Sequence, residues 1–158
     1  MLSHVDKSNH PTMVDVGKKE TTHRTACARA VIIFPEDLIE ADKDPLLTKK
    51  GPVIDTAIVA GVLAAKKTHH LIPFCHPIPI EDCSIKIEWN AKKELEVLCS
   101  VRATHKTGVE MEALTGASVA ALTVYDMCKS LSHEIQIQKV VLVSKTGGKT
   151  DFLELEKL

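Results

Sequence analysis

Residues 80–99 read IEDCSIKIEWNAKKELEVLC, and this stretch decides the fold. Apolar and polar residues alternate up to Trp89, which is the pattern of a strand with one buried face. Residues 90–93 are polar and predict a turn, and the alternation resumes over residues 95–99. Two alternating segments joined by a short polar turn predict an antiparallel hairpin in the middle of the chain.

The segments on either side of this hairpin extend the pattern to six elements. Residues 24–34 predict a first strand, and residues 52–69 predict a helix at whose first position Pro52 is well suited. After the hairpin, residues 107–130 predict a second long helix and residues 135–144 a last strand. The order β-α-β-β-α-β predicts a ferredoxin-like α+β fold, a four-stranded antiparallel sheet with two long helices on one face.

Composition bounds the class of protein. The 158 residues suit a single domain, with a polar lead-in over residues 1–22 and a flexible tail over residues 146–158. The 20 basic and 21 acidic residues leave a net charge of -1, which gives no case for a nucleic-acid partner. Apolar runs are too short for a signal peptide or a membrane span, and the five cysteines lack a CxxC pair. We therefore expect a cytoplasmic protein with free thiols and no membrane partner.

Three charged residues near the ends of the two helices are candidates for catalysis. Lys50 precedes the first helix, where a lysine and helix-terminal amides can together meet a phosphate. Asp126 and Lys129 are spaced i, i+3 on the second helix, and Lys129 continues an apolar seam. Desolvation beside that seam would make Lys129 an acid or base near neutrality, oriented by Asp126. The structural alternatives are a solvated loop lysine at position 50 and a lysine that suits the helix C-terminus at position 129.

A second group of candidates lies on a loop and at the start of the second helix. Three prolines stiffen residues 72–80, which present Cys75 and His76 either for chemistry or as parts of a rigid turn. Zinc is not expected, because an adjacent Cys and His cannot easily bind one ion and no second pair matches. Glu110 ends a Thr-x-x-Glu capping box, so it either caps the helix or contacts a substrate. Glu112 has no local role beyond favouring the positive helix end.

The spacing of Glu112 and Asp126 limits how one ligand can contact both residues. Glu112 and Asp126 are 14 residues apart on one helix, a separation of roughly 21 Å at about 1.5 Å per residue. A compact ligand cannot contact both from one chain, so a site that uses both is predicted to be shared between subunits.

The stretch KTGGKT from Lys145 is not a phosphate loop, because Val143 stands where the first glycine is required and no helix follows. Lys145 can still contribute a phosphate-binding charge.

Seven blocks of sequence, in order along nearly the whole chain, carry a family resemblance. They are MVDVG (13–17), KG (50–51), AGVLAAK (60–66), LIPFCHP (71–77), KTGVEMEALT (106–115), AALTVYDMCK (120–129) and KTGGK (145–149). These blocks resemble the molybdenum cofactor biosynthesis protein C family, the cyclic pyranopterin monophosphate synthases. The resemblance implies a lyase that converts 3′,8-cyclo-7,8-dihydro-GTP, made by a radical GTP cyclase, into cyclic pyranopterin monophosphate with release of pyrophosphate. We expect it to need no cofactor and no metal.

The resemblance also implies roles for individual residues. It implies catalytic roles for Lys50, Asp126 and Lys129, without deciding which lysine is the acid and which the base. It implies substrate contacts for Phe74, Cys75, His76, Met111 and Glu112, with Glu110 and Lys145 lining the same pocket. A homohexamer, a trimer of dimers with sites between subunits, is implied as well. The chain departs from the family at Ile58, where an arginine is common, and at His105, where a glycine is common.

Two other functions compete with this one. A non-catalytic module that binds a small nucleotide and regulates a partner would need an anion site but neither Asp126 nor Lys129. An RNA-binding domain on the same fold would display aromatic side chains on its sheet, and Trp89 alone gives poor support.

Overall fold

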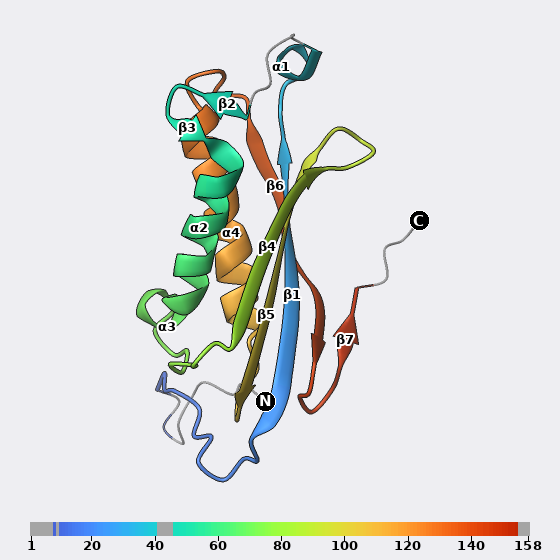
Figure 1. Ribbon diagram of the computed structural model, residues 1–158. Coiled ribbons are helices and arrows are strands. Elements are labelled where there is room, and N and C mark those ends of the chain that lie inside the picture. Colours follow the sequence, from blue (N-terminus) through green and yellow to red (C-terminus); the bar gives the residue numbers. More distant parts are fainter. Residues whose placement is uncertain (1–7, 9, 41–45, 155–158) are drawn as a thin grey trace.

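A computed structural model describes residues 8, 10–40 and 46–154 of the chain (Figure 1). Residues 1–7 and 9 of the expected lead-in and residues 155–158 of the expected tail lie outside the described residues. In chain order the elements are β1 (Thr22–Ile33), α1 (Glu36–Glu40), β2 (Leu47–Thr48), β3 (Gly51–Pro52), α2 (Val53–Lys66), α3 (Thr68–Leu71), β4 (Asp82–Trp89), β5 (Leu95–His105), α4 (Glu110–Cys128), β6 (Gln136–Thr146) and β7 (Phe152–Leu153). Across these described ranges, no helix combines the length and the apolarity needed to cross a bilayer.

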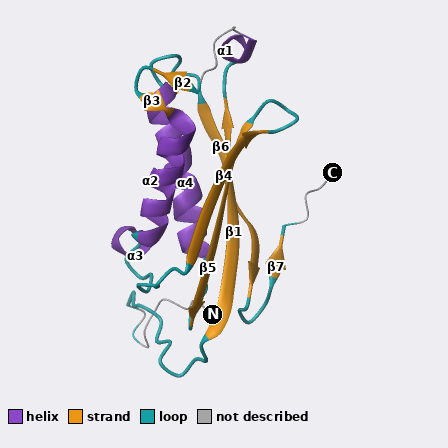
Figure 2. Cartoon of the chain, viewed as in Figure 1, coloured by secondary structure: helices purple, strands orange, loops and turns teal. Residues whose placement is uncertain are grey.

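The central layer is a five-stranded antiparallel sheet in the order β4-β5-β1-β6-β7 (Figure 2). β1 lies in the middle and pairs with β5, from Thr22 opposite His105 to Ile32 opposite Leu95. Both long helices, α2 and α4, lie on one face of the sheet (Figure 1). This mixed architecture is compatible with the ferredoxin-like arrangement, and the predicted hairpin is present as β4 and β5.

The strand count differs from the expected four. β7 pairs Phe152 with Lys145 and Leu153 with Ser144, so part of the expected flexible tail extends the sheet. The chain turns back at Gly147, whose φ of 80° suits glycine and where a Cβ would collide with the carbonyl of His23. β2 and β3 form a separate two-stranded sheet. Strands of two residues carry no alternation, which is why the sequence pattern did not predict them.

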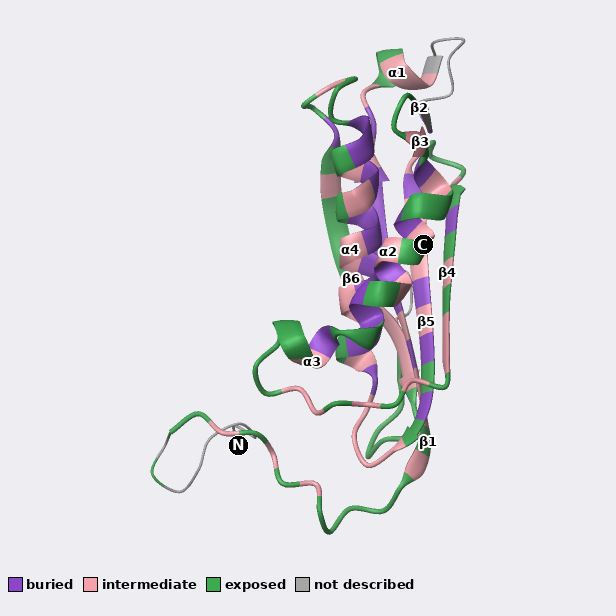
Figure 3. Ribbon diagram, turned by 60° about the vertical axis from the view of Figure 1, so that its left-hand side comes forward, coloured by how far each residue is buried: buried purple, intermediate pink, exposed green. Residues whose placement is uncertain are grey.

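The core lies between the helices and the sheet, where the buried residues meet (Figure 3). On β5 every second residue from Leu95 to Ala103 is fully buried, as its alternation predicts. The α2 and α4 backbones approach closely at Gly61 and Gly116. A Cβ at Gly61 would lie 2.8 Å from the carbonyl oxygen of Gly116 and would collide with the side chain of Ile85. Small residues on both helices therefore set the spacing of the helical layer.

The start of α4 corrects the predicted capping box. The helix begins at Glu110 with Val109 as its N-cap, and no side chain caps it. Because the helix starts three residues later than predicted, Thr107 lies outside it and cannot act as the cap. The apolar seam expected to lead to Lys129 is also interrupted, since Leu122 is 56% exposed. α4 is instead buried through its small residues, from Ala113 to Cys128.

Candidate active site

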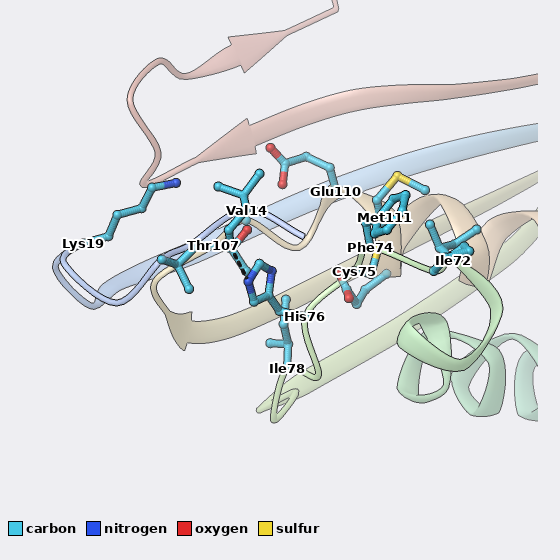
Figure 4. A pocket seen from close by; sticks show the side chains of 14 residues that line it. Val14, Lys19, Ile72, Phe74, Cys75, His76, Ile78, Thr107, Glu110 and Met111 are labelled. Atoms are coloured by element: carbon cyan, nitrogen blue, oxygen red, sulfur yellow. Dashed lines mark hydrogen bonds between the residues drawn. The ribbon is translucent and has the colours of Figure 1, made fainter. Parts of the chain in front are cut away.

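A pocket of about 600 Å³ opens at the N-terminal end of α4. It is formed by the proline-rich loop after α3, the first turn of α4 and the segment that precedes β1 (Figure 4). Six of the predicted substrate-contacting residues line it: Phe74, Cys75, His76, Glu110, Met111 and Glu112. Lys145, the seventh, reaches the same place from the end of β6, because its Nζ lies 3.0 Å from Oε1 of Glu110. The structure therefore brings the seven residues of this group together.

Glu110 lines this pocket and pairs with Lys145, and it does not form the expected helix cap. Its ion pair with Lys145 is half-buried, with about 30% of each side chain exposed. The pair joins the first turn of α4 to the last residues of β6, two elements on different layers of the fold. It places one cation and one carboxylate beside the pocket, and an incoming anion would compete with Glu110 for Lys145.

Glu112 is the buried carboxyl of the pocket, with only 3% of its surface exposed. Burial, helped by the negative charge of Glu110, raises its pKa from 4.5 to about 7. Burial and the charge of Glu112 in turn raise the pKa of the Cys75 thiol. Near neutral pH the pocket thus holds a carboxyl poised to exchange a proton and a thiol that stays protonated.

The opposite, C-terminal end of α4 carries the second cluster. Nζ of Lys129 lies 2.7 Å from Oδ1 of Asp126, and Nζ of Lys50 lies 3.5 Å from Oδ2. Lys50 also donates to the backbone carbonyl of Asp126 at 2.7 Å. The hydrogen bond and charge of Lys129, followed by the charge of Lys50, lower the pKa of Asp126. The structure therefore brings the three predicted catalytic residues together, although they come from the β2–β3 turn and the end of α4.

The environment of Lys129 differs from the predicted one. Its side chain is 48% exposed, and the hydrogen bond and charge of Asp126 raise its pKa. Within this chain the desolvation expected for Lys129 does not lower its pKa, because the hydrogen bond and charge of Asp126 outweigh it. A partner surface or a bound ligand would be needed to lower its pKa.

The two clusters lie at opposite ends of one unbroken helix. α4 runs from Glu110 to Cys128 without interruption, so a rise of about 1.5 Å per residue places Glu112 and Asp126 roughly 21 Å apart. Figure 1 shows the β2–β3 turn beside one end of α4 and the loop after α3 beside the other. A single chain therefore does not bring all the candidate residues to one place.

Residues of the N-terminal segment were missed as site residues. Val14, Val16 and Lys19 line the pocket, although the sequence indicated only a polar lead-in. The signal was present in the MVDVG block, where the half-buried Val14 and Val16 alternate with exposed neighbours. Lys19 had no signal of its own, since an exposed lysine in an irregular segment has no pattern.

Basic groups gather behind the pocket. His105 ends β5, and its Nδ1 accepts the backbone N–H of Thr107 at 3.4 Å. Burial, then the nearby charges of His76, Arg24 and Lys106, lower its pKa. Lys19 lines the pocket and Lys145 pairs with Glu110 beside it, so two lysines are within reach of a phosphorylated ligand there. His105, a departure from the family pattern, thus lies beside the pocket.

Two further observations concern metals and the sheet. Within residues 8, 10–40 and 46–154, no three His, Cys, Asp or Glu side chains converge as a metal site would require. Trp89 packs edge-to-face against Phe34 at 5.4 Å, so its ring is engaged in an intramolecular contact.

The fold and these clusters define a small α+β protein with a pocket at one end of α4 and a cluster of charged residues at the other. The chain belongs to the MoaC family, which it matches over residues 13–148. It is 52% identical over 151 residues to the cyclic pyranopterin monophosphate synthase of Xanthomonas campestris pv. campestris (strain 8004), covering 95% of this chain and 92% of that protein. It is 44% identical to the synthase of Campylobacter lari, covering 94% and 95%. It is also 48% identical to the molybdenum cofactor biosynthesis bifunctional protein of Synechocystis sp., covering 96% of this chain and 45% of that protein.

Proposed function

We propose that this chain is a cyclic pyranopterin monophosphate synthase of molybdenum cofactor biosynthesis. It would act as a lyase on 3′,8-cyclo-7,8-dihydro-GTP and release pyrophosphate, as one catalytic domain of ferredoxin-like fold. The observation that carries the proposal is family membership over residues 13–148 together with the clustering of the predicted residues into two charged groups. The bifunctional relative supports a coupling to another step of the same biosynthesis, for which we propose the radical GTP cyclase.

The residue roles follow from the charges that the reaction creates. A hydroxyl of the substrate's sugar-derived part gives up its proton to a basic group and attacks the first phosphorus, the bond to the bridging oxygen breaks, and pyrophosphate leaves with the electron pair. Two lysines near the pocket, Lys145 and Lys19, would stabilise the negative charge that accumulates on the phosphates. The proton transfers of ring opening and closure would use Lys50 and the Lys129–Asp126 pair.

We further propose that the working site is shared between subunits. The pocket at one end of α4 lacks the Lys50–Asp126–Lys129 cluster, and that cluster is largely exposed. A symmetric dimer can bring the cluster of one chain to the pocket of its partner, and would form two such sites at once. The desolvation of Lys129 that this chain alone does not provide would then come from the partner. A homohexamer of three such dimers, acting in the cytoplasm, completes the proposal.

A coupled assay tests the reaction. The purified chain is mixed with GTP and a radical cyclase, and the oxidised fluorescence of pyranopterin and the release of pyrophosphate are followed. The wild-type chain is expected to form both products, whereas Lys50→Ala and Lys129→Ala accumulate the cyclo-GTP intermediate. The matched control is Lys86→Ala, an exposed lysine of β4 that pairs with Glu88. Accumulation of the intermediate with the wild-type chain would favour the regulatory module instead.

Mixing of inactive variants tests the shared site. His76→Ala removes a pocket residue and Lys129→Ala removes a residue of the other cluster. After the two are denatured together and refolded, about a quarter of the sites would carry two intact halves if each site uses two chains of a symmetric dimer. Activity near that fraction is expected. A mixture no more active than either variant alone would contradict the shared site.

A further inference from the structure

The pocket has a wall without regular secondary structure, residues 13–19, which we call the N-terminal wall. Its Val14, Val16 and Lys19 line the pocket, and β1 begins only at Thr22. Two local hydrogen bonds shape it, from the N–H of Gly17 to Oδ1 of Asp15 at 2.8 Å and from the N–H of Lys19 to the carbonyl of Val16 at 3.1 Å. The wall is therefore a preformed turn that must still be held against the body of the protein.

Two side chains of the body donate to backbone carbonyls of the wall. Nε2 of His76 lies 2.9 Å from the carbonyl oxygen of Val14, a contact visible in Figure 4. Nζ of Lys106 donates to the carbonyl of Gly17 at 2.7 Å. The two contacts hold the wall at separate points, three residues apart, so together they fix its position and its orientation.

The backbone at Lys106 is itself fixed by a hydrogen-bond donor from β1. Arg24 of β1 donates to the carbonyls of His105 and Lys106, at 3.3 and 3.5 Å. The Lys106 ammonium is directed to Gly17, and the residue does not line the pocket. A charged donor on a carbonyl makes a stronger hydrogen bond than a neutral one, so Lys106 suits the task of fixing a segment.

We propose that Lys106 is a positioning residue that holds the N-terminal wall closed over the pocket and so keeps Lys19 at the pocket rim. His76 is the second attachment, and it differs from Lys106 because its ring also lines the pocket. Without Lys106 the wall loses one of its two side-chain attachments, so less of the conformational entropy that its ordering costs is offset. The wall then opens and substrate binding weakens. The chemical step is not affected, because the residues that carry it are unchanged.

Limited trypsin digestion tests the attachment without any substrate. Lys18 and Lys19 are cleavage sites within the wall, and their cleavage tracks the fraction of open molecules. In Lys106→Ala we expect cleavage there to be roughly fivefold faster, the factor that one exposed charge-assisted hydrogen bond represents. Lys106→Arg, which can still donate to Gly17, should restore the wild-type rate, and Lys86→Ala is the matched control. Equal cleavage in Lys106→Ala and wild type, at equal thermal stability, would overturn the proposal.

Steady-state kinetics test the consequence, and this part rests on the proposed synthase activity. Lys106→Ala should raise KM roughly fivefold and leave kcat within about twofold, since the lost contact acts on binding alone. A changed kcat with an unchanged KM would overturn the positioning role. If the wild-type chain shows no synthase activity, the proposed function fails, but the digestion result still decides whether Lys106 holds the wall.

Discussion

The buried carboxyl of Glu112 gives the sharpest prediction on stability. Its pKa rises from 4.5 to about 7 on folding, and each pH unit is worth about 1.4 kcal/mol. Ionised Glu112 therefore costs the folded state about 3 kcal/mol, since only 3% of the residue is exposed. Glu112→Gln keeps the shape of the side chain and cannot ionise, so it removes this cost.

The sign of the pH dependence follows from the raised pKa. Below pH 4.5 the carboxyl is protonated in both the folded and the unfolded chain, so it costs nothing. As pH rises from 4.5 to 7 only the unfolded chain loses the proton, and the free energy of unfolding falls. Above pH 7 the full cost is present. The gain from Glu112→Gln should therefore be larger at pH 8 than at pH 5 by about 2.5 kcal/mol.

Urea unfolding at pH 5 and pH 8 measures this difference. Wild type, Glu112→Gln and the control Glu134→Gln, an exposed glutamate, are compared in the same buffers. We expect the advantage of Glu112→Gln to grow with pH and Glu134→Gln to follow wild type at both values. An advantage that is independent of pH would refute the idea that burial raises the pKa of Glu112.

Two further predictions concern packing and the thiol. Gly61→Ala should lower the free energy of unfolding by roughly 1–3 kcal/mol, because its Cβ meets Ile85 and the backbone of Gly116; a change below about 0.5 kcal/mol in urea unfolding would mean that the helices move apart freely. Cys75 should react slowly with iodoacetamide until the pH exceeds 9, because burial and then the charge of Glu112 raise its pKa. In Glu112→Gln that charge is gone, so Cys75 should be alkylated faster at pH 8, as measured by the mass of its peptide. An unchanged rate would mean that the charge of Glu112 does not affect the Cys75 thiol.

The long elements could be predicted from the sequence because each has a period. The alternation over residues 80–99 produces β4 and β5, and the helix predicted over residues 107–130 is present as α4. Boundaries were less predictable, since the Thr-x-x-Glu pattern matched a capping box that the backbone does not form. β7 has two residues and depends on the turn at Gly147, so only the folded chain shows it.

The site could be predicted in its members but not in its arrangement. Family blocks indicated Cys75, His76 and Glu112, yet no local pattern shows that Val14 and Lys19 join them, because that contact spans some sixty residues. The pKa of Lys129 could not be predicted from the seam, because it depends on the ion pair with Asp126 and on how far each side chain is exposed. Conversely, the separation of the two clusters followed from helix geometry alone.

Supplying the purified intermediate tests the proposed function most directly. The chain is incubated with 3′,8-cyclo-7,8-dihydro-GTP, without the radical cyclase, and pyranopterin and pyrophosphate are quantified together. We expect the two products in equal amounts and at equal rates, because formation of the cyclic phosphate expels pyrophosphate. Intermediate that remains unchanged, or pyrophosphate released without pyranopterin, would contradict the assignment of this chain as the synthase.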